Sequence, residues 1–341
     1  MDLIAGLSIK RDSVWCLVGK EIKQMERIPC VHVVDGIKFS FEPARTRNGN
    51  SQSTMLDNIF SKAFSFFENY QASISHLSIS THGPYRKAVQ TDSEGNARAS
   101  IEKVTHEDTR FAVGGADLGD YVTTYFGYAF SQKTSIVHDG SAVALGEFVR
   151  RMQAKRVPFS DGDPRTKTVV ALLFGRGVGG GICAGGQVWS GHLHSEMGHI
   201  SVGMPRNDSR ISTCQHHGHD CLHGLASTDA LNVSSDGTMT RQQMYQLSQY
   251  VARLAQTVTC VLSPSSIVIG GSLMWQNPEC LELIRTSAKN LFIKGKASYF
   301  TYDELLNEDF LDLSDQSAQH FGTLYSASTE AWRTQDRFYA V

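Results

Sequence analysis

Two cysteines and two histidines near the middle of the chain are spaced as metal ligands. Cys214, His217 and Cys221 fall within one short loop, and His199 lies fifteen residues before Cys214. Two thiolates and two imidazoles form the closed tetrahedral shell that suits structural Zn²⁺. Because four protein ligands leave no open coordination position, a zinc ion that activates water is not expected here. The sequence therefore predicts a structural zinc loop over residues 199–221.

The same loop admits other interpretations. His216, His219 and His223 lie close to His217, so the spacing by itself does not decide which imidazole binds the metal. A histidine-rich surface loop with two unrelated thiols is the interpretation without a metal. We favour zinc, because this arrangement of cysteines and histidine is far more specific than a scattered set of the same residues.

A glycine-rich loop follows a predicted buried strand upstream of the metal loop. Residues 167–174 are almost continuously apolar, which is typical of a strand buried on both faces. The loop contains three glycines and one arginine that could contact a nucleotide: Gly175, Arg176, Gly177 and Gly179. Glycines let backbone N–H groups approach phosphate oxygens without a Cβ in the way. A plain hairpin between 169–174 and 181–184 explains the same residues, so the loop alone is a weak indication.

Polar or glycine turns also follow three other predicted strands. Asp139 lies between a short strand over 134–137 and a helix over 142–153. Taken alone, this position favours a helix N-cap. The alternative is a carboxylate exposed at the carboxyl edge of a sheet, where α/β proteins bind ligands. Turns of the same kind end the strands predicted over 77–80 and 266–269, at Gly83-Pro84 and at Gly270-Gly271.

The elements around these residues alternate as in an α/β protein. Strands are predicted over residues 1–40 as a meander, the segment 85–113 is predicted to be a loop or flap, and the remaining helices are predicted over 54–70, 118–130, 241–262, 280–292 and 321–332. The length predicts two lobes. We place them at 1–116, completed by the C-terminal segment 318–341, and at 117–317.

Composition narrows the class of protein. The chain has 341 residues, 41% hydrophobic and 19% charged, with a net charge of -2, as in a soluble globular protein. No block of Lys and Arg indicates nucleic acid or a membrane surface as a partner. No signal peptide and no run of 18 apolar residues is evident. Seven scattered cysteines suit a reducing compartment, so a cytoplasmic location is expected.

Six segments together resemble the ROK family of sugar kinases and repressors, most closely its zinc-containing bacterial fructokinase branch. Their order and approximate intervals match over nearly the whole chain, which is far more specific than any single motif. The segments, each with the family pattern it resembles, are Gly83-Pro84 (FGP), Asp139–Glu147 (DxNAAALGE), Gly175–Gly181 (GTGxGGG), Glu196–His199 (GEIGH), Cys214–Ser227 (CPxHGxCxEGLAS) and Ile267–Met274 (IVLGGGVM).

The resemblance implies an α/β fold of the actin-like ATPase (ribonuclease H-like) type, with two lobes and a cleft between them. It implies that Asp139 is the general base of an ATP- and Mg²⁺-dependent phosphorylation of fructose or a related sugar. The implied sugar-binding residues are Gly83, Ser141, Glu196, His199 and His223. The implied nucleotide-binding residues are Gly175, Arg176, Gly177, Gly179, Gly270 and Gly271. Members of the family often dimerise, so a homodimer is left open.

Departures from the family pattern concern mostly the phosphate loops. The family begins with D/E-x-GGTK, but here Ser8 falls at the acidic position and Lys10, Arg11 and Asp12 replace the glycines and threonine. Arg176 replaces a phosphate-contacting threonine, and Ser141 and His223 replace an Asn and a Glu on the sugar side. Two hypotheses follow. The first is an active sugar kinase that grips phosphate by charge, and the second is a non-catalytic descendant that senses a sugar or sugar phosphate.

Overall fold

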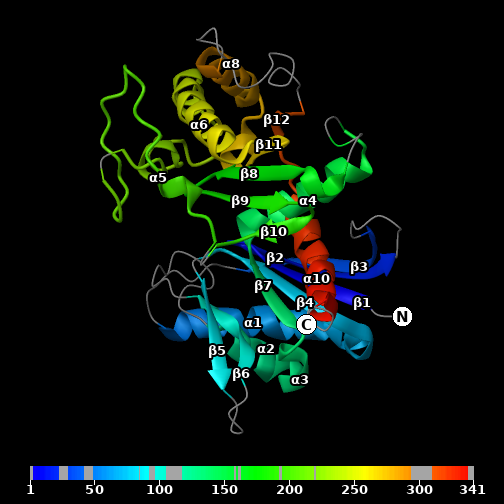
Figure 1. Ribbon diagram of the computed structural model, residues 1–341. Helices are drawn as coiled ribbons and strands as arrows, with labels where there is room; N and C mark the ends of the chain where they lie inside the picture. The colour runs from blue at the N-terminus through cyan, green and yellow to red at the C-terminus, as the bar shows by residue number, and fades with distance from the viewer. Residues whose placement is uncertain are drawn as a thin grey trace. The chain divides into compact units, whose positions relative to one another are not determined.

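The computed structural model describes residues 3–22, 30–41, 49–83, 85–91, 97–104, 117–156, 159, 163–191, 194–218, 220–292 and 309–336. The chain divides into two compact units. Unit 1 comprises residues 1–142, 190–194 and 319–341, and unit 2 comprises residues 143–189 and 195–318. Each unit contains a five-stranded mixed sheet with helices, so the predicted α/β class is confirmed (Figure 1). Among the described residues, no helix is both long enough and apolar enough to cross a membrane.

The sheet of unit 1 has the strand order β3-β2-β1-β4-β7. Strands β1, β2 and β3 form the antiparallel meander that was predicted over residues 1–40, whereas β4 and β7 extend it parallel to β1. The bounds are Leu3–Ile9 for β1, Ser13–Ile22 for β2, Cys30–Ser40 for β3, Ile74–Thr81 for β4 and Thr134–His138 for β7.

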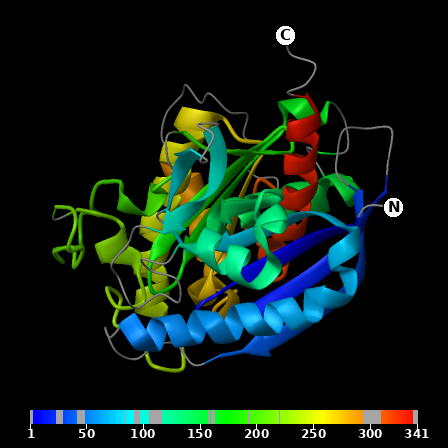
Figure 2. The ribbon, with the colours of Figure 1, turned by 90° about the horizontal axis from the view of Figure 1, so that it is seen from below.

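Side chains along β1 point alternately to the two faces of this sheet, and each face packs against different helices. Ala5, Leu7 and Ile9 pack into a core with α1 (Gly49–Phe67) and α2 (Leu118–Phe126). Figure 2 shows α1 running along the sheet. Ile4 packs instead with Leu324 of α10 (Ala318–Asp336), and Gly6 allows this helix close, since a Cβ there would lie 3.0 Å from the Leu324 nitrogen. Side chains at even positions of β1 therefore face α10.

Two segments of unit 1 differ from expectation. Within 85–113, predicted to be a loop or flap, β5 (Tyr85–Thr91) and β6 (Ala97–Val104) pair as an antiparallel ribbon. The prediction missed them because two paired strands can satisfy each other's backbone groups without an apolar alternation. Residues 105–113 and Pro84 lie outside the described residues. Residues 117–142, which we expected to open the second lobe, lie in unit 1, because β7 pairs with β4.

Unit 2 repeats the strand order of unit 1. Its sheet runs β10-β9-β8-β11-β12, with β8, β9 and β10 antiparallel and with β11 and β12 parallel to β8. The hairpins β1–β2 and β8–β9 are therefore topologically equivalent, although the two sequences show no obvious repeat. The bounds are Thr168–Phe174 for β8, Val178–Ala184 for β9, Gln187–Trp189 for β10, Ser266–Gly270 for β11 and Leu311–Leu313 for β12.

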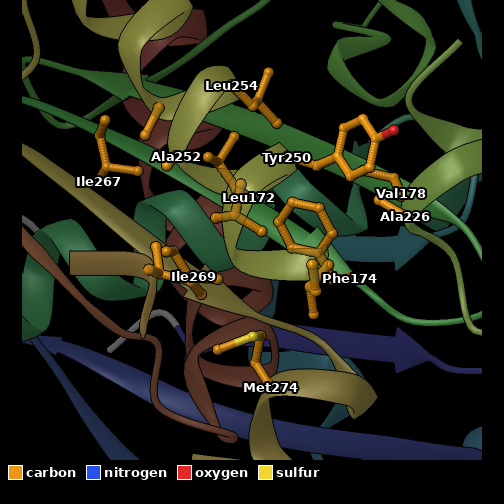
Figure 3. Packing of buried hydrophobic residues seen from close by; sticks show 14 of the residues in the cluster. Leu172, Phe174, Val178, Ala226, Tyr250, Ala252, Leu254, Ile267, Ile269 and Met274 are labelled. Atoms are coloured by element: carbon orange, nitrogen blue, oxygen red, sulfur yellow. The ribbon is translucent and has the colours of Figure 1, made fainter. Parts of the chain in front are cut away.

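The core of unit 2 lies between its sheet and two long helices. Helix α6 (Arg241–Leu262) begins with a capping box between Thr240 and Gln243, and its bounds match the prediction. Its apolar stripe, which includes Tyr250 and Leu254, meets Leu172 and Phe174 of β8 (Figure 3). Burial of each such side chain contributes about 1.5–3 kcal/mol. Helix α8 (Cys280–Phe292) packs beside α6, with α7 (Ser272–Gln276) between β11 and α8 in the chain.

An ion-pair network fixes α4 (Asp139–Gln153) to the segment around β12. Arg151 is completely buried and donates to Asp312 Oδ2 at 3.0 Å and to the Asp309 carbonyl at 3.0 Å. Glu147 is also buried, and its carboxylate accepts from Arg150 at 2.6 Å and from the Asp315 N–H at 2.5 Å. The glutamate of the ALGE segment therefore has a structural role in unit 2.

Candidate functional site

The predicted metal ligands of unit 2 converge. Ligand atoms of His199, Cys214, His217 and Cys221 all lie within 4.8 Å of one another. His199 Nδ1 is 3.6 Å from Cys214 Sγ and 3.5 Å from Cys221 Sγ, and His217 Nδ1 is 3.7 Å from Cys214 Sγ. With usual bond lengths, two such ligands of tetrahedral Zn²⁺ are separated by roughly 3.6 Å. The donor set and its spacing therefore fit zinc, with His217 rather than a neighbouring histidine in the described part of the loop.

Local hydrogen bonds hold the metal loop in shape. Ser212 Oγ accepts the Cys214 N–H at 3.2 Å and donates to the Cys221 carbonyl at 3.1 Å. Gly224 packs so closely against Ser212 that a Cβ on Gly224 would lie 2.0 Å from Ser212 Oγ. Burial is the largest of the causes that raise the pKa of the Cys221 thiol. A bound Zn²⁺ would lower that pKa again, because the thiolate is the ligand.

His223 links the metal loop to the glycine turn within unit 2. Its ring stacks on His199, with centroids 4.7 Å apart and an interplanar angle of 8°. The Val178 N–H donates to His223 Nδ1 at 3.4 Å, and a Cβ on Gly177 would lie 3.0 Å from His223 Cε1. Glu196 is exposed just before η3 (Met197–His199), and its carbonyl accepts the His199 N–H at 3.0 Å.

The two glycine turns of unit 2 lie against each other. The Gly175 N–H donates to the Gly177 carbonyl at 2.9 Å, which closes the β8–β9 hairpin. A Cβ on Gly175 would lie 2.9 Å from Ser272 Oγ, just beyond Gly270-Gly271. The predicted hairpin between these two strands is thus confirmed. A hairpin turn rich in glycine is compatible with nucleotide binding, because glycines let backbone N–H groups approach phosphate oxygens.

The glycines of these turns differ in what surrounds them. Gly271 has a φ of +91°, and a Cβ there would lie 2.3 Å from the Phe174 carbonyl oxygen, so this residue is required by packing. A Cβ on Gly270 would lie 2.0 Å from Ser314 Oγ. A Cβ on Gly179, in contrast, would meet no described atom within 4 Å. Arg176 is exposed at the tip of the hairpin.

Asp139 is held at the junction of β7 and α4. The helix begins at Asp139 itself, and Oδ1 of this carboxylate accepts the Gly140 N–H at 2.7 Å. His138 Nε2 lies 3.2 Å from the same oxygen. Oδ2 accepts no hydrogen bond from the described residues, and the side chain is 28% exposed. Asp139 is therefore the first residue of the helix and not the N-cap that its position in the sequence favoured, while its role as a carboxylate that contacts a ligand stays a prediction.

Sequence reasoning did not single out His138 and His194. Their rings stack with centroids 4.4 Å apart and an interplanar angle of 17°. A Cβ on Gly83 would lie 2.7 Å from the His194 ring and 3.1 Å from His138 Cδ2. His138 could have been noticed as the neighbour of Asp139, whereas no local signal points to His194. Ser141, an expected sugar residue, is only 3% exposed.

The first strand of unit 1 carries no acid at the position where the family pattern has one. Ser8 faces α10, and its Oγ is 3.2 Å from His320 Nδ1. Burial, followed by the charges of Lys10 and Lys38, lowers the pKa of His320 to about 3, so the imidazole is neutral near pH 7. Burial also lowers the pKa of Lys10, against the attraction of Asp139.

Comparison with known proteins gives a consistent assignment. A sequence model described as ROK family matches residues 128–306, which is more than half of the chain. The chain is 34% identical over 129 residues to a fructokinase of Lactococcus lactis subsp. cremoris. The aligned segment covers 35% of this chain and 42% of that protein. It therefore spans less than half the length of this relative.

Solved structures resemble the whole chain. The ROK hexokinase of Thermus thermophilus has a TM-score of 0.62 at 16% identity, over 97% of this chain and 99% of that chain. A ROK family glucokinase of Streptomyces griseus, in complex with glucose and AMPPNP, has a TM-score of 0.58 at 16% identity, over 96% of this chain and 99% of that chain. At these identities the likeness concerns the fold, and it confirms the predicted actin-like ATPase architecture.

Proposed function

The chain belongs to the ROK family, and from this we propose that it is a kinase that transfers the γ-phosphoryl group of ATP to a hydroxyl group of a hexose. The observation that carries the proposal is the carboxylate of Asp139, with one oxygen anchored and the other available at the end of a parallel strand. The fructokinase name of the Lactococcus relative supports fructose or a related sugar as substrate. It also favours the kinase over a non-catalytic sensor.

Asp139 acts as the general base in this proposal. Gly140 and His138 hold Oδ1, so that Oδ2 can take the proton of one sugar hydroxyl. The sugar oxygen then forms its bond to the γ-phosphorus while the bond between that phosphorus and the β,γ-bridging oxygen breaks. ADP leaves with that oxygen. Positioning of the two reactants supplies most of the rate enhancement in such transfers.

The residues of unit 2 have supporting roles in the proposal. Glu196 and the His199 ring hold sugar hydroxyls, and His223 supports the His199 ring by stacking on it. Zinc bound by His199, Cys214, His217 and Cys221 would supply no reacting group; it would fix the orientation of the loop. Because both cysteine sulfurs lie close to His199 Nδ1, this nitrogen is the atom of the ring that would bind the metal.

The nucleotide is assigned to the glycine turns of unit 2. Gly179 presents an open backbone and the exposed Arg176 presents a positive charge, both of which suit phosphate oxygens. A Mg²⁺ ion lacks an expected ligand on the first strand, because Ser8 replaces the carboxylate that the family pattern places near this ion. The residues of the first strand therefore do not fit a Mg²⁺ site.

Measurement of ADP release with a panel of hexoses tests the function. We expect sugar-dependent ADP release from ATP, abolished by Asp139→Asn, while the dissociation constant for ATP changes little. Asp120→Asn, which removes an exposed carboxylate from the first turn of α2, is the matched control and retains activity. Full turnover by Asp139→Asn would remove this residue from its role, and an absence of ATP binding to the wild type would remove the kinase.

A further inference from the structure

We propose that Asp208 is a positioning residue for the metal loop, because it holds the segment before Cys214 in its zinc-binding shape even when no metal is bound. We call residues 205–213 the anchor segment. The proposal concerns the four-ligand site of unit 2 and does not depend on the kinase function. A loop that is already in place loses less conformational entropy when it binds an ion, so the anchor segment should increase the affinity for zinc.

The carboxylate of Asp208 is the centre of a hydrogen-bonded cluster. Arg210 contacts both of its oxygens, with Nε donating to Oδ1 at 3.0 Å and Nη2 donating to Oδ2 at 2.7 Å. The Arg210 N–H also donates to Oδ1, at 3.0 Å. The Asp208 side chain is only 6% exposed, and the hydrogen bonds from the Arg210 side chain are the largest of the causes that lower its pKa to about 2. The pair is therefore an ionised, two-point contact of the strong kind.

Two further contacts attach this pair to distant parts of unit 2. The Tyr250 hydroxyl of α6 donates to Asp208 Oδ2 at 2.9 Å, and Arg210 Nη1 donates to the Ala230 carbonyl at 2.9 Å. Tyr250 is completely buried in the core of unit 2, and burial is the largest of the causes that raise its pKa, so its hydroxyl remains a donor. The anchor segment is thus fixed to the core by contacts that include no metal ligand.

Hydrogen bonds carry this fixed position to the two cysteine ligands. The Thr213 N–H donates to the Gly224 carbonyl at 3.0 Å, and Ser212 Oγ accepts the Cys214 N–H at 3.2 Å. The same hydroxyl donates to the Cys221 carbonyl at 3.1 Å. The backbones of the two cysteines are therefore connected to each other and to a segment that is fixed on α6, independently of an ion between their sulfurs.

The four ligands differ in how firmly the chain holds them. An isolated β-bridge joins Ser201, two residues after His199, to Cys221. His217 is exposed instead, with Nδ1 3.7 Å from Cys214 Sγ, in the part of the loop beyond the anchor segment. We therefore expect three ligands to be in place before the ion binds, and His217 to complete the shell when it does.

Hydrogen–deuterium exchange of the full chain, with zinc and after its removal by a chelator, tests the anchor segment. The amides of Asp208, Arg210 and Thr213 are hydrogen-bonded, so we expect the anchor segment to stay protected in both states. Residues 215–218 should exchange faster once zinc is removed. In Asp208→Asn, which keeps the size of the side chain but not its charge, the anchor segment should lose protection in the metal-free state. Equal loss of protection in both segments of the metal-free wild type would overturn the proposal.

Competition with a chromogenic zinc chelator measures the effect on affinity. We expect Asp208→Asn to raise the Kd for zinc about tenfold, and Tyr250→Phe, which removes only the hydroxyl, to raise it by a smaller factor. Asp229→Asn removes an exposed carboxylate from the same unit and is the matched control, with the Kd of the wild type.

Urea unfolding of the metal-free variants separates positioning from general stabilisation. A residue that merely stabilised unit 2 would lower the free energy of unfolding and leave the Kd of the folded chain unchanged, and this result for Asp208→Asn would overturn the proposal. A raised Kd in a variant that still unfolds cooperatively would support it. Because zinc affinity is measured without ATP or sugar, neither result depends on whether the chain phosphorylates a hexose.

Discussion

His138 Nε2 lies 3.2 Å from Asp139 Oδ1, although the two residues belong to different elements, the end of β7 and the start of α4. The Gly140 N–H reaches the same oxygen. A carboxylate with one oxygen fixed in this way presents its other oxygen in a defined direction. His138 is therefore a positioning residue for the proposed base, and its own position depends on stacking against His194.

Substitution of His138 should affect turnover more than substrate affinity. We expect His138→Ala to lower kcat by about tenfold with little change in KM, since orientation of the base matters in the transition state. His138→Asn retains an N–H group and should recover part of the loss. His32→Ala, which removes an exposed histidine from β3, is the control. An unchanged kcat for His138→Ala in steady-state assays would exclude the positioning role.

Two glycines of unit 2 should respond to alanine in opposite ways. Gly271→Ala would place alanine in the left-handed region of φ and press its Cβ against the backbone of Phe174. It should therefore lower the free energy of unfolding by about 1–3 kcal/mol. The Cβ added by Gly179→Ala would meet no described atom within 4 Å, so this variant should keep nearly the same stability while binding ATP more weakly. Urea unfolding and calorimetry with ATP would show the two effects separately. Normal ATP affinity in Gly179→Ala would argue that phosphates do not approach this glycine.

The metal loop should contain one zinc ion per chain. Elemental analysis of the purified protein checks the stoichiometry, and Cys214→Ser should lose the metal together with thermal stability, because binding free energy contributes to folding. Cys260→Ser removes an exposed cysteine of α6 and should retain both. A folded wild-type protein without metal after purification in the absence of chelators would contradict the zinc assignment.

The buried His320 should make unit 1 sensitive to acid. Its pKa in the folded chain is about 3 against an ordinary value of 6.5, with burial as the largest cause. As the pH falls from about 6.5 towards 3, the unfolded chain takes up a proton that the folded chain does not, so stability decreases across this window. His76, with a pKa of about 4, acts in the same direction.

Comparison of variants isolates the contribution of His320. His320→Gln should show a smaller loss of unfolding free energy between pH 7 and pH 5 than the wild type, whereas His32→Gln should behave as the wild type does. Chemical denaturation at the two pH values provides the measurement. An equal loss in His320→Gln and in the wild type would assign the acid sensitivity to other groups.

Elements and sites with local determinants were predictable from sequence. The stripe of α6 repeats every three or four residues, and its bounds were predicted correctly. β8 is a continuous apolar run, and Cys214, His217 and Cys221 belong to one short loop that can bring them together without help from distant residues. Each of these features depends on periodicity or spacing over a few residues, which a single sequence displays directly.

Relationships between distant segments were decided by the tertiary structure. Ser8 meets His320 across more than three hundred residues, His138 meets His194, and Gly177 meets His223, all because packing brings their elements together. The ribbon of β5 and β6 is stabilised by pairing that its side-chain pattern does not reveal. The sequence by itself determined the family fold, and it identified the metal ligands and the carboxylate of Asp139 as candidates. Only the folded chain determined which groups surround them, because those neighbours are selected by packing rather than by spacing along the chain.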